Sequence, residues 1–298
     1  AKTTTEAPLL ELEIATPIDL LPAKGILLEN PANKYQQIDA FVQAYIDFYE
    51  IPGVSLALIE DGKLSYHQTY GVKNTITQAA VTAQTIFEAA SITTPVFAFA
   101  VCRLAEKGLI DLDRPLYQYL PFEEIAHDER YQLITARHVL THQTGFPNWR
   151  RGKMQITFDP GTQFGYSGEG FEYLKRVVVH ITQKDIIQIM EEEVLSPLQL
   201  ENFYFKKSDH LFSVVANGHY YQHANMANLP DEAGMAWSMH TEARSLTDFA
   251  IALLNRQGLT RNSYDDLFTK HTNTDKFNEL QMDGWSSHFG LGIQIEEP

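Results

Sequence analysis

Ser91 stands just before an apolar run at 95–107, which predicts a buried helix that begins near this serine. The first N–H groups of a helix have no partner within it and lie at the positive end of its dipole, so they stabilise negative charge. A serine hydroxyl at this position can attack a carbonyl carbon, while nearby N–H groups stabilise the oxyanion that forms. Serine is also a frequent helix N-cap, so the same position has a purely structural interpretation.

Thr94 lies one helical turn after Ser91, on the face where a base acting on the serine would be placed. A threonine hydroxyl carries no charge and is a poor base. On the spacing alone, capping is therefore the commoner interpretation of Ser91, and any catalytic interpretation depends on the surrounding sequence.

The expected elements around this helix are an antiparallel sheet and a group of helices. Apolar residues at three- and four-residue spacing predict a helix over 34–49, and Asp61-Gly62 between strand-like runs at 54–59 and 63–70 predicts a hairpin. Further elements are expected as helices at 136–142, 170–181, 185–195 and 241–255 and as a last strand at 289–295. The order predicts an α+β fold, with one antiparallel sheet built from both chain ends and a mostly helical lobe inserted.

The 298 residues fit an N-terminal arm at 1–30 followed by one domain at 31–298. The sheet part of this domain is expected at about 31–75 and 285–298, and the helical lobe at about 76–284.

Composition limits the partners. The chain has 38 acidic and 23 basic residues, a net charge of -15 and no basic stripe, which disfavours nucleic acid and anionic lipid as partners. No apolar run approaches the roughly 18 residues that a membrane-spanning helix needs. The single Cys102 forbids an internal disulfide and leaves the compartment open.

Five segments follow one another in an order typical of one superfamily. They are Phe87-Glu88-Ala89-Ala90-Ser91-Ile92-Thr93-Thr94-Pro95, then residues 105–115 with 119–121, and 134–146, 160–168 and 230–249. Together they resemble the serine β-lactamase and penicillin-binding-protein superfamily, nearest the class C β-lactamase-like esterases and D-amino-acid peptidases, over roughly residues 35–295.

The resemblance implies that Ser91 is the acylated nucleophile of a Ser-x-x-Lys motif and that Tyr166 is the general base or acid of a Tyr-x-Asn motif. Gly168 stands at the position of the asparagine, so one contact to a substrate amide is lost, and Ser167 or Glu169 can partly replace it. A small-molecule or peptide substrate is implied, with no cofactor and no metal.

Trp149 follows the turn at 145–148 and is expected either to line the mouth of the substrate pocket or to pack in the core.

Thr94 departs from the family pattern because it occupies the position of the lysine. A phenol ordinarily titrates near pH 10, so a catalytic tyrosine needs a neighbouring cation to act as a base at neutrality. The family's Lys-x-Gly or His-x-Gly strand is also not evident before Pro298, which suggests a chain that ends early by family standards. His288-Phe289-Gly290 fits the short pattern, although residues 289–292 look more like the preceding family strand.

Two functions follow from these features. The first is a β-lactamase-like serine hydrolase that forms an acyl-enzyme from small esters, amides or peptides. The alternative is a catalytically impaired pseudoenzyme or binding protein of the same fold, because Thr94 replaces the lysine. The resemblance implies a periplasmic or secreted protein, while the oligomeric state is open and a neighbouring chain supplying missing strands is a third possibility.

Two other motifs suggest different chemistry. Gly165-Tyr166-Ser167-Gly168-Glu169 comes close to the Gly-x-Ser-x-Gly nucleophile elbow, which would make Ser167 the nucleophile, but a loop rather than a strand precedes it.

The pairs His138/His142 and His219/His223 have a spacing that suits metal ligation. However, no aspartate or glutamate lies at a sequence spacing that would complete a metal site with them. We expect His142 to brace the turn at 144–145 instead.

Overall fold

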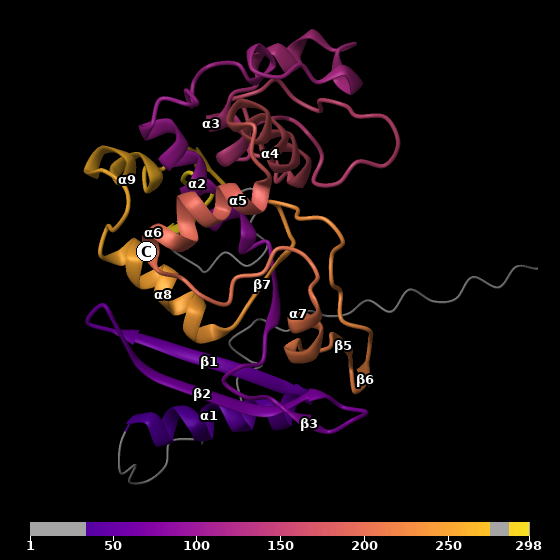
Figure 1. The fold of residues 1–298 in the computed structure, drawn as a ribbon, viewed down its shortest axis with the longest axis vertical. Coiled ribbons are helices and arrows are strands. Elements are labelled where there is room, and N and C mark those ends of the chain that lie inside the picture. Colours follow the sequence, from indigo (N-terminus) through magenta and orange to yellow (C-terminus); the bar gives the residue numbers. More distant parts are fainter. Residues whose placement is uncertain (1–33, 275–285, 298) are drawn as a thin grey trace, which may run out of the picture.

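The computed structural model describes residues 34–274 and 286–297, so the expected arm at 1–30 lies outside the described residues. The first helix and hairpin lie together at one end of the molecule (Figure 1). Helix α1 spans Lys34–Tyr49, and strands β1 and β2 span Gly53–Glu60 and Lys63–Asn74, which confirms the predicted helix and hairpin. Positive φ angles at Asp61 and Gly62 turn the chain between the two strands.

Asp39 fastens α1 to one face of this hairpin. Its carboxylate accepts hydrogen bonds from the hydroxyls of Tyr66 and Tyr70 on β2, and the ring of Tyr35 stacks on Tyr66 with 4.7 Å between centroids. Helix α8, Ala243–Leu254, packs against the other face of β1 and β2 (Figure 1). The hairpin is thus covered by a helix on each side.

Helix α2, Thr93–Glu106, runs through the centre of the helical lobe and is buried on nearly every side, as its apolar composition predicts. The other helical segments are η1 Leu116–Gln118, η2 Glu123–Ile125, η3 Glu129–Leu133, α3 Ala136–Leu140, α4 Gly168–Thr182, α5 Ile186–Met190, η4 Glu191–Leu195, α6 Ser196–Leu198, α7 Asp209–Val214 and α9 Arg261–Leu267. The helices expected at 136–142, 170–181 and 241–255 are confirmed to within a few residues. The segment expected as one helix at 185–195 divides into α5 and the π-helical turn η4.

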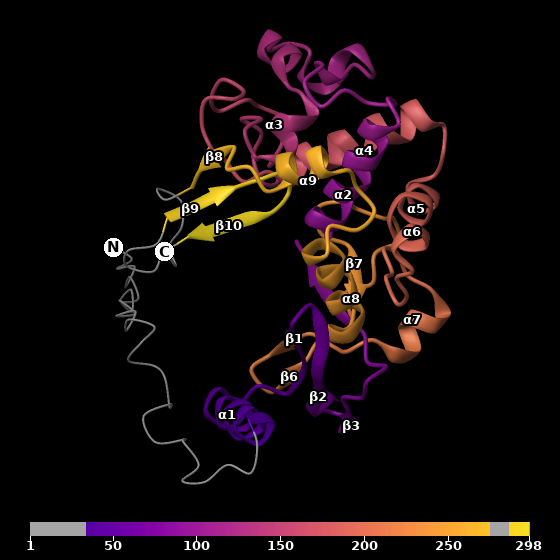
Figure 2. The same cartoon turned by 90° about the vertical axis from the view of Figure 1, so that its left-hand side faces the viewer.

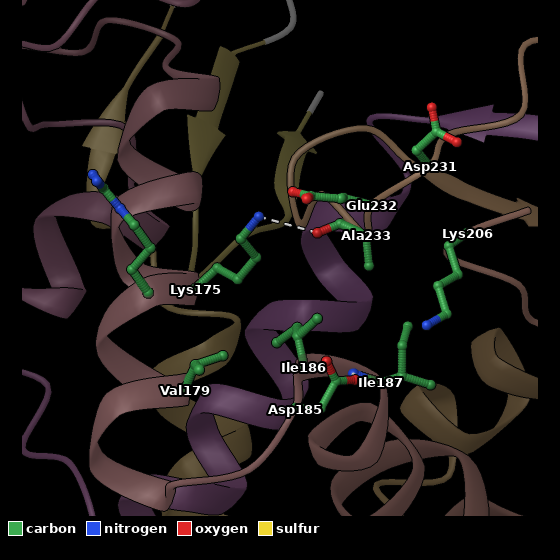
Figure 3. Close-up of a pocket in the computed structure, with 10 residues that line it drawn as sticks. Lys175, Val179, Asp185, Ile186, Ile187, Lys206, Asp231, Glu232 and Ala233 are labelled. Atoms are coloured by element: carbon green, nitrogen blue, oxygen red, sulfur yellow. Dashed lines mark hydrogen bonds between the residues drawn. The ribbon is translucent and has the colours of Figure 1, made fainter.

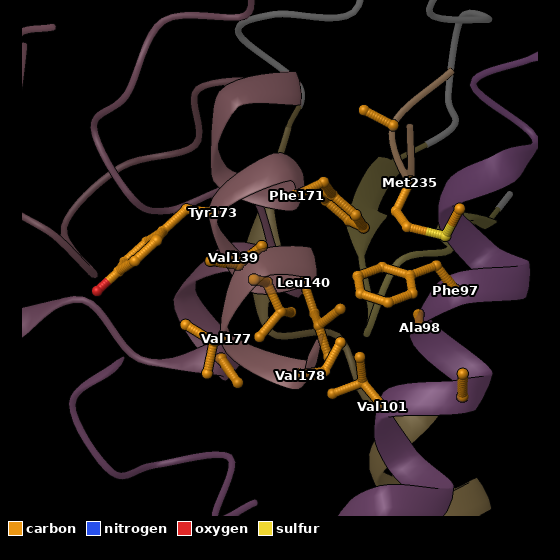
Figure 4. Close-up of a cluster of buried hydrophobic side chains, with 14 of the residues drawn as sticks. Phe97, Ala98, Val101, Val139, Leu140, Phe171, Tyr173, Val177, Val178 and Met235 are labelled. Atoms are coloured by element: carbon orange, nitrogen blue, oxygen red, sulfur yellow. The ribbon is translucent and has the colours of Figure 1, made fainter. Parts of the chain in front are cut away.

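The main core joins α2 to α3 and α4 (Figure 4). Phe97 of α2 faces Phe171 of α4 with 6.4 Å between ring centroids, and Leu140 of α3 and Met235 belong to the same cluster. All four side chains are buried. This packing fixes the first turn of α2 beside the first turn of α4.

The prediction of a last strand at 289–295 is wrong, because the chain forms a hairpin there. Strands β9 and β10 span Ser286–Phe289 and Gln294–Glu297 and pair antiparallel. Between them the N–H of Gly290 donates to the carbonyl of Ile293, and Gly292 has a φ of 74°. A Cβ at Gly292 would lie 2.5 Å from the Cβ of Ala98, so this glycine lets the turn pack directly on α2.

The α+β class with antiparallel pairing is confirmed, but the strands of the two chain ends do not share one sheet among the described residues. The sheets are β1-β2-β3, with β3 at Ala79–Ala80, and β10-β9-β8, with β8 at Thr272–Asn273. Strand β9 uses both edges for β8 and β10, so it has no free edge for β1 (Figure 2). Two short pairs complete the strands: β4 Phe87–Ala90 with β7 Met239–Thr241, and β5 His219–Tyr220 with β6 His223–Ala224. Among the described helices, none has the combination of length and apolarity needed to span a bilayer.

Replacing the carboxylate that joins α1 to β2 tests its contribution to stability. We expect Asp39→Ala to lower the free energy of unfolding by about 1–3 kcal/mol, because two phenol donors lose a charged acceptor. Urea denaturation measures the change. The control is Asp47→Ala on the same helix, whose carboxylate is exposed and bonds to Gln43; it should cost less than about 0.5 kcal/mol. Equal losses in the two variants would contradict the assignment.

Candidate active site

Ser91 lies in the turn that connects β4 to α2. Ala90, the last residue of β4, pairs with Met239 of β7 and has a φ of 44°, in the left-handed region. The N–H of Ile92 then donates to the carbonyl of Ala89 at 3.0 Å, and α2 begins at Thr93. The helix therefore starts after Ser91 rather than at it, because the chain must first turn away from its pairing with β7.

The structure does not support a capping role for Ser91. The N-cap of α2 is Ile92, and no side chain caps this helix. The Ser91 side chain is exposed, and no hydrogen bond joins its hydroxyl to another described residue. A left-handed alanine costs roughly 1–2 kcal/mol, and strain of this kind is often found at functional sites. The turn thus presents a free hydroxyl beside the N-terminus of a buried helix.

Thr93 and Thr94 use their hydroxyls to hold this turn in place. Thr93 Oγ1 donates to the carbonyl of Ala90 and accepts the N–H of Met239 at 3.0 Å, which ties the turn to β7. Thr94 Oγ1 donates to the carbonyl of Ser91 at 2.9 Å, and the residue is 4 % exposed. Thr94 therefore stabilises the turn and contributes no charge.

Tyr166 is half-buried and stands just before helix α4. Its ring stacks on the imidazole of His142, with 4.1 Å between centroids and 26° between planes. The next residue, Ser167, caps α4: its Oγ accepts the N–H of Gly170 at 3.0 Å and donates to the carbonyl of Pro147 at 2.9 Å. Because Ser167 is buried and its hydroxyl is committed to the cap, the nucleophile-elbow interpretation of this segment is not supported.

His142 is a buried, neutral support for Tyr166. Its Nδ1 accepts the N–H of Ser167 at 3.0 Å, and burial lowers the pKa of the imidazole to about 3. The proton of the neutral ring is therefore on Nε2, which has no hydrogen-bond partner among the described residues. The imidazole fixes the backbone after Tyr166 rather than the turn at 144–145, and it supplies no positive charge to the phenol.

His138 and His142, whose spacing suits a metal, have separate contacts in the structure. His138 completes the capping box of α3 through Thr135, whereas His142 faces Tyr166 and Ser167. Within the described ranges, no three histidine, cysteine, aspartate or glutamate side chains are grouped to hold a metal ion.

The turn at 290–293 joins the serine side of the site to the tyrosine side. The ring of Phe289 lies 4.8 Å from His142 between centroids, and the N–H of Gly292 donates to the carbonyl of Leu140 at 2.7 Å. A Cβ at Gly292 would lie 3.3 Å from the carbonyl oxygen of Thr94. The first turns of α2 and α4 are therefore neighbours through this hairpin and through the Phe97–Phe171 contact. Sequence reasoning placed residues 289–292 in a family strand but did not predict these contacts.

Trp149 and Gly168 are brought together at the first turn of α4. A Cβ at Gly168 would lie 2.6 Å from Cη2 of Trp149, so the indole occupies the space of a side chain at this position. Trp149 is 47 % exposed, and the expectation that it packs in the core is wrong. The carboxylate of Glu169 accepts the N–H of Arg150 at 3.2 Å and lies 3.6 Å from Nε of its guanidinium.

A cavity of about 470 Å³ lies between α4, the start of α5 and residues 231–233 (Figure 3). Lys175 points across it and donates to the carbonyl of Ala233 at 3.0 Å. None of the site residues predicted from the sequence lines this cavity. It is therefore separate from the turn that carries Ser91.

Comparison with known proteins identifies a family model and curated relatives of low sequence identity. A family model described as Beta-lactamase matches residues 38–298. Protein flp of Staphylococcus aureus (strain MW2) is 23 % identical over 194 residues, which are 59 % of this chain and 39 % of that protein. An uncharacterized protein of Alkalihalophilus pseudofirmus is 25 % identical over 162 residues, which are 54 % of this chain and 47 % of the relative. The chain thus matches less than half the length of these curated relatives.

Two solved structures share the fold at low identity. The octameric penicillin-binding protein homologue from Pyrococcus abyssi superposes with a TM-score of 0.75 at 18 % identity, covering 88 % of this chain and 65 % of that one. EstCE1, a hydrolase with promiscuous acyltransferase activity, gives a TM-score of 0.74 at 17 % identity, covering 89 % and 83 %.

The neutral state of His142 predicts a specific dependence of stability on pH. The folded imidazole has a pKa of about 3 and the unfolded one titrates near its ordinary pKa of 6.5, so the unfolded chain takes up the proton first as pH falls. This contribution to stability is complete above pH 6.5 and is lost progressively towards pH 3, by about 1.4 kcal/mol per pH unit.

We expect His142→Asn to remove this part of the pH dependence. Asparagine tolerates the left-handed φ of 55° at this position and offers an acceptor to the N–H of Ser167. Urea denaturation of both proteins at pH 7 and pH 5 gives the comparison, and His210→Asn, which removes an exposed imidazole, is the control. If wild type and His142→Asn lose the same stability between these pH values, His142 is not the buried neutral group described here.

Proposed function

The chain belongs to the beta-lactamase family, and we propose that it acts as a serine hydrolase that forms an acyl-enzyme through Ser91. The observation that carries this proposal is the Ser91 hydroxyl, which is exposed, does not cap a helix and stands in a strained turn before α2. The substrates are small esters, amides or peptides. Members of one fold host many activities, so the proposal rests on this site and not on the fold.

The proposed reaction has two steps that use the same serine. Ser91 Oγ attacks the substrate carbonyl and its proton passes through Tyr166 to the leaving oxygen or nitrogen, so that a serine ester forms as the C–O or C–N bond breaks. Water then attacks this ester and returns a proton to Ser91, releasing the acid. In this proposal the N–H of Ser91 and the positive end of the α2 dipole stabilise the oxyanion in both steps.

The position of Tyr166 supports its part in this reaction. The tyrosine is held between the stacked His142 and the cap at Ser167, on the helix that packs against α2. EstCE1, which shares the fold, is described as a hydrolase with acyltransferase activity, and acyl transfer also proceeds through an acyl-enzyme.

One observation favours the alternative of a binding protein with little turnover. Thr94 stands where the resemblance places a lysine, and its hydroxyl is buried and bonded to the carbonyl of Ser91. The neutral His142 cannot replace the missing cation beside Tyr166. General-base assistance contributes typically about 10²–10⁴-fold, so a hydrolase without this cation is expected to be slow.

Labelling by a fluorophosphonate separates the two functions. We expect intact-protein mass spectrometry to find one adduct per chain, which Ser91→Ala abolishes. Thr94→Lys is expected to accelerate labelling by roughly 10²-fold or more, because the new lysine, as its neutral amine, takes up the serine proton. Thermal denaturation establishes that each variant is folded.

Ser167→Ala is the control for the serine that was labelled. It removes a helix cap at a cost of about 1 kcal/mol but should keep the adduct. A folded wild-type chain that stays unlabelled while Thr94→Lys is labelled would establish the binding protein instead.

A further inference from the structure

We propose that the Trp149 indole is the binding surface for the acyl group of a neutral, apolar ester, so that Trp149 and Gly168 together determine substrate specificity. This inference rests on the proposed function of Ser91 and names the substrate class for that site. Four observations carry it: the space above Gly168, the hydrogen bonds of the residues that flank the tryptophan, its exposure, and the pairing of Arg150 with Glu169.

The indole takes the place of any side chain at position 168. A Cβ at Gly168 would lie 2.6, 2.7 and 3.0 Å from three carbon atoms of the six-membered ring of Trp149. Contacts below 3.0 Å between such atoms do not occur without displacement of one of them. The surface next to Tyr166 and Ser167 is therefore an aromatic hydrocarbon and not a hydrogen-bonding group. A substrate amide finds no hydrogen-bonding partner there, whereas an apolar group of the substrate can pack against the indole.

The backbone on both sides of Trp149 is held in position before any ligand binds. The carbonyl of Asn148 accepts the N–H groups of Gly168 and Glu169 at 3.0 and 3.1 Å, and its side-chain oxygen also accepts from Gly168 at 3.1 Å. On either side, the carbonyl of Pro147 accepts the Ser167 hydroxyl and the N–H of Arg150 donates to Glu169. A surface ordered by folding loses little conformational entropy on binding, which favours affinity for small groups.

The indole is available to a ligand. Trp149 remains 47 % exposed although its ring contacts Gly168, which is buried. An ordered, half-exposed tryptophan beside the position of a catalytic residue is typical of ligand contact surfaces, which are mostly apolar with few polar groups.

Arg150 and Glu169, which follow Trp149 and Gly168 in the chain, are paired with each other. The guanidinium of Arg150 lies 3.6 Å from the carboxylate of Glu169 and is also paired with Glu124. Neither ion is left to bind a carboxylate or an ammonium of the substrate without breaking this arrangement. The site therefore favours an uncharged substrate, and an ester with an alkyl or aryl acyl group has this chemistry.

Ester chain length tests the proposal, with p-nitrophenyl acetate and p-nitrophenyl hexanoate as substrates. Both have the same leaving group, so only the acyl group differs. Trp149→Ala is expected to lower kcat/KM for the hexanoate by roughly 10–100-fold and for the acetate by less than about threefold. Trp149→Phe, which keeps an aromatic ring, should retain most of the preference. Equal losses for the two esters would overturn the proposal.

A substitution at Gly168 tests the contact between Gly168 and the indole independently. Gly168→Ala is expected to displace the indole and reduce the same chain-length preference. In Trp149→Ala the added methyl group meets no ring, so the double variant should behave as Trp149→Ala alone. Additive losses in the double variant would show that Gly168 acts independently of Trp149, against the proposal.

A binding measurement separates failure of this inference from failure of the proposed function. The ketone 2-octanone is a neutral analogue of the ester that cannot be hydrolysed. We expect it, and not acetone, to shift the indole N–H resonance of Trp149 in the Ser91→Ala protein. The resonance is identified by its absence in Trp149→Phe. A shift without any ester hydrolysis by wild type would keep the acyl-binding surface and reject the hydrolase, whereas no shift would reject the surface.

Discussion

The arrangement depends on the burial of helix α2 on nearly every side. A helix that is apolar on every side is stable only in the middle of the core. From there α2 determines the positions of the elements that pack against it. Phe97 places α4 beside it, Ala98 receives the turn at 290–293, and the residues before the helix pair with β7. Ser91 is exposed because the chain must turn from β4 into this buried helix within a few residues.

Hydrogen bonds and stacked rings, rather than charges, hold the groups around this serine. The Thr93 and Thr94 hydroxyls bind the turn, and His142 supports Tyr166 as a neutral ring. In a buried, apolar setting, a charged imidazole would cost more than it contributes, and its lowered pKa follows from that cost. These contacts hold the serine turn and the tyrosine in place, and none of them involves a cation.

The first turn of α4 is likewise held by packing and hydrogen bonds. Glycine at position 168 has no side chain, and the indole of Trp149 occupies the space that a Cβ there would take. Residues 147–148 accept hydrogen bonds from the start of the helix, and these bonds hold the backbone that carries the indole. The surface beside Tyr166 and Ser167 is therefore apolar at this point.

The sequence alone determined the features that depend on neighbours along the chain. Helix α1, the hairpin around Asp61-Gly62 and the buried character of α2 follow from periodicity and turn chemistry, and the ordered motifs indicated the family that the Beta-lactamase match confirms. Tertiary structure decided where α2 begins, that Ser91 does not cap it, that His142 stacks on Tyr166 and that Trp149 covers Gly168. It also turned the expected last strand into a hairpin, since Gly292 must fit against α2. These features join residues far apart in sequence, and local patterns carry no information about which distant surfaces will meet.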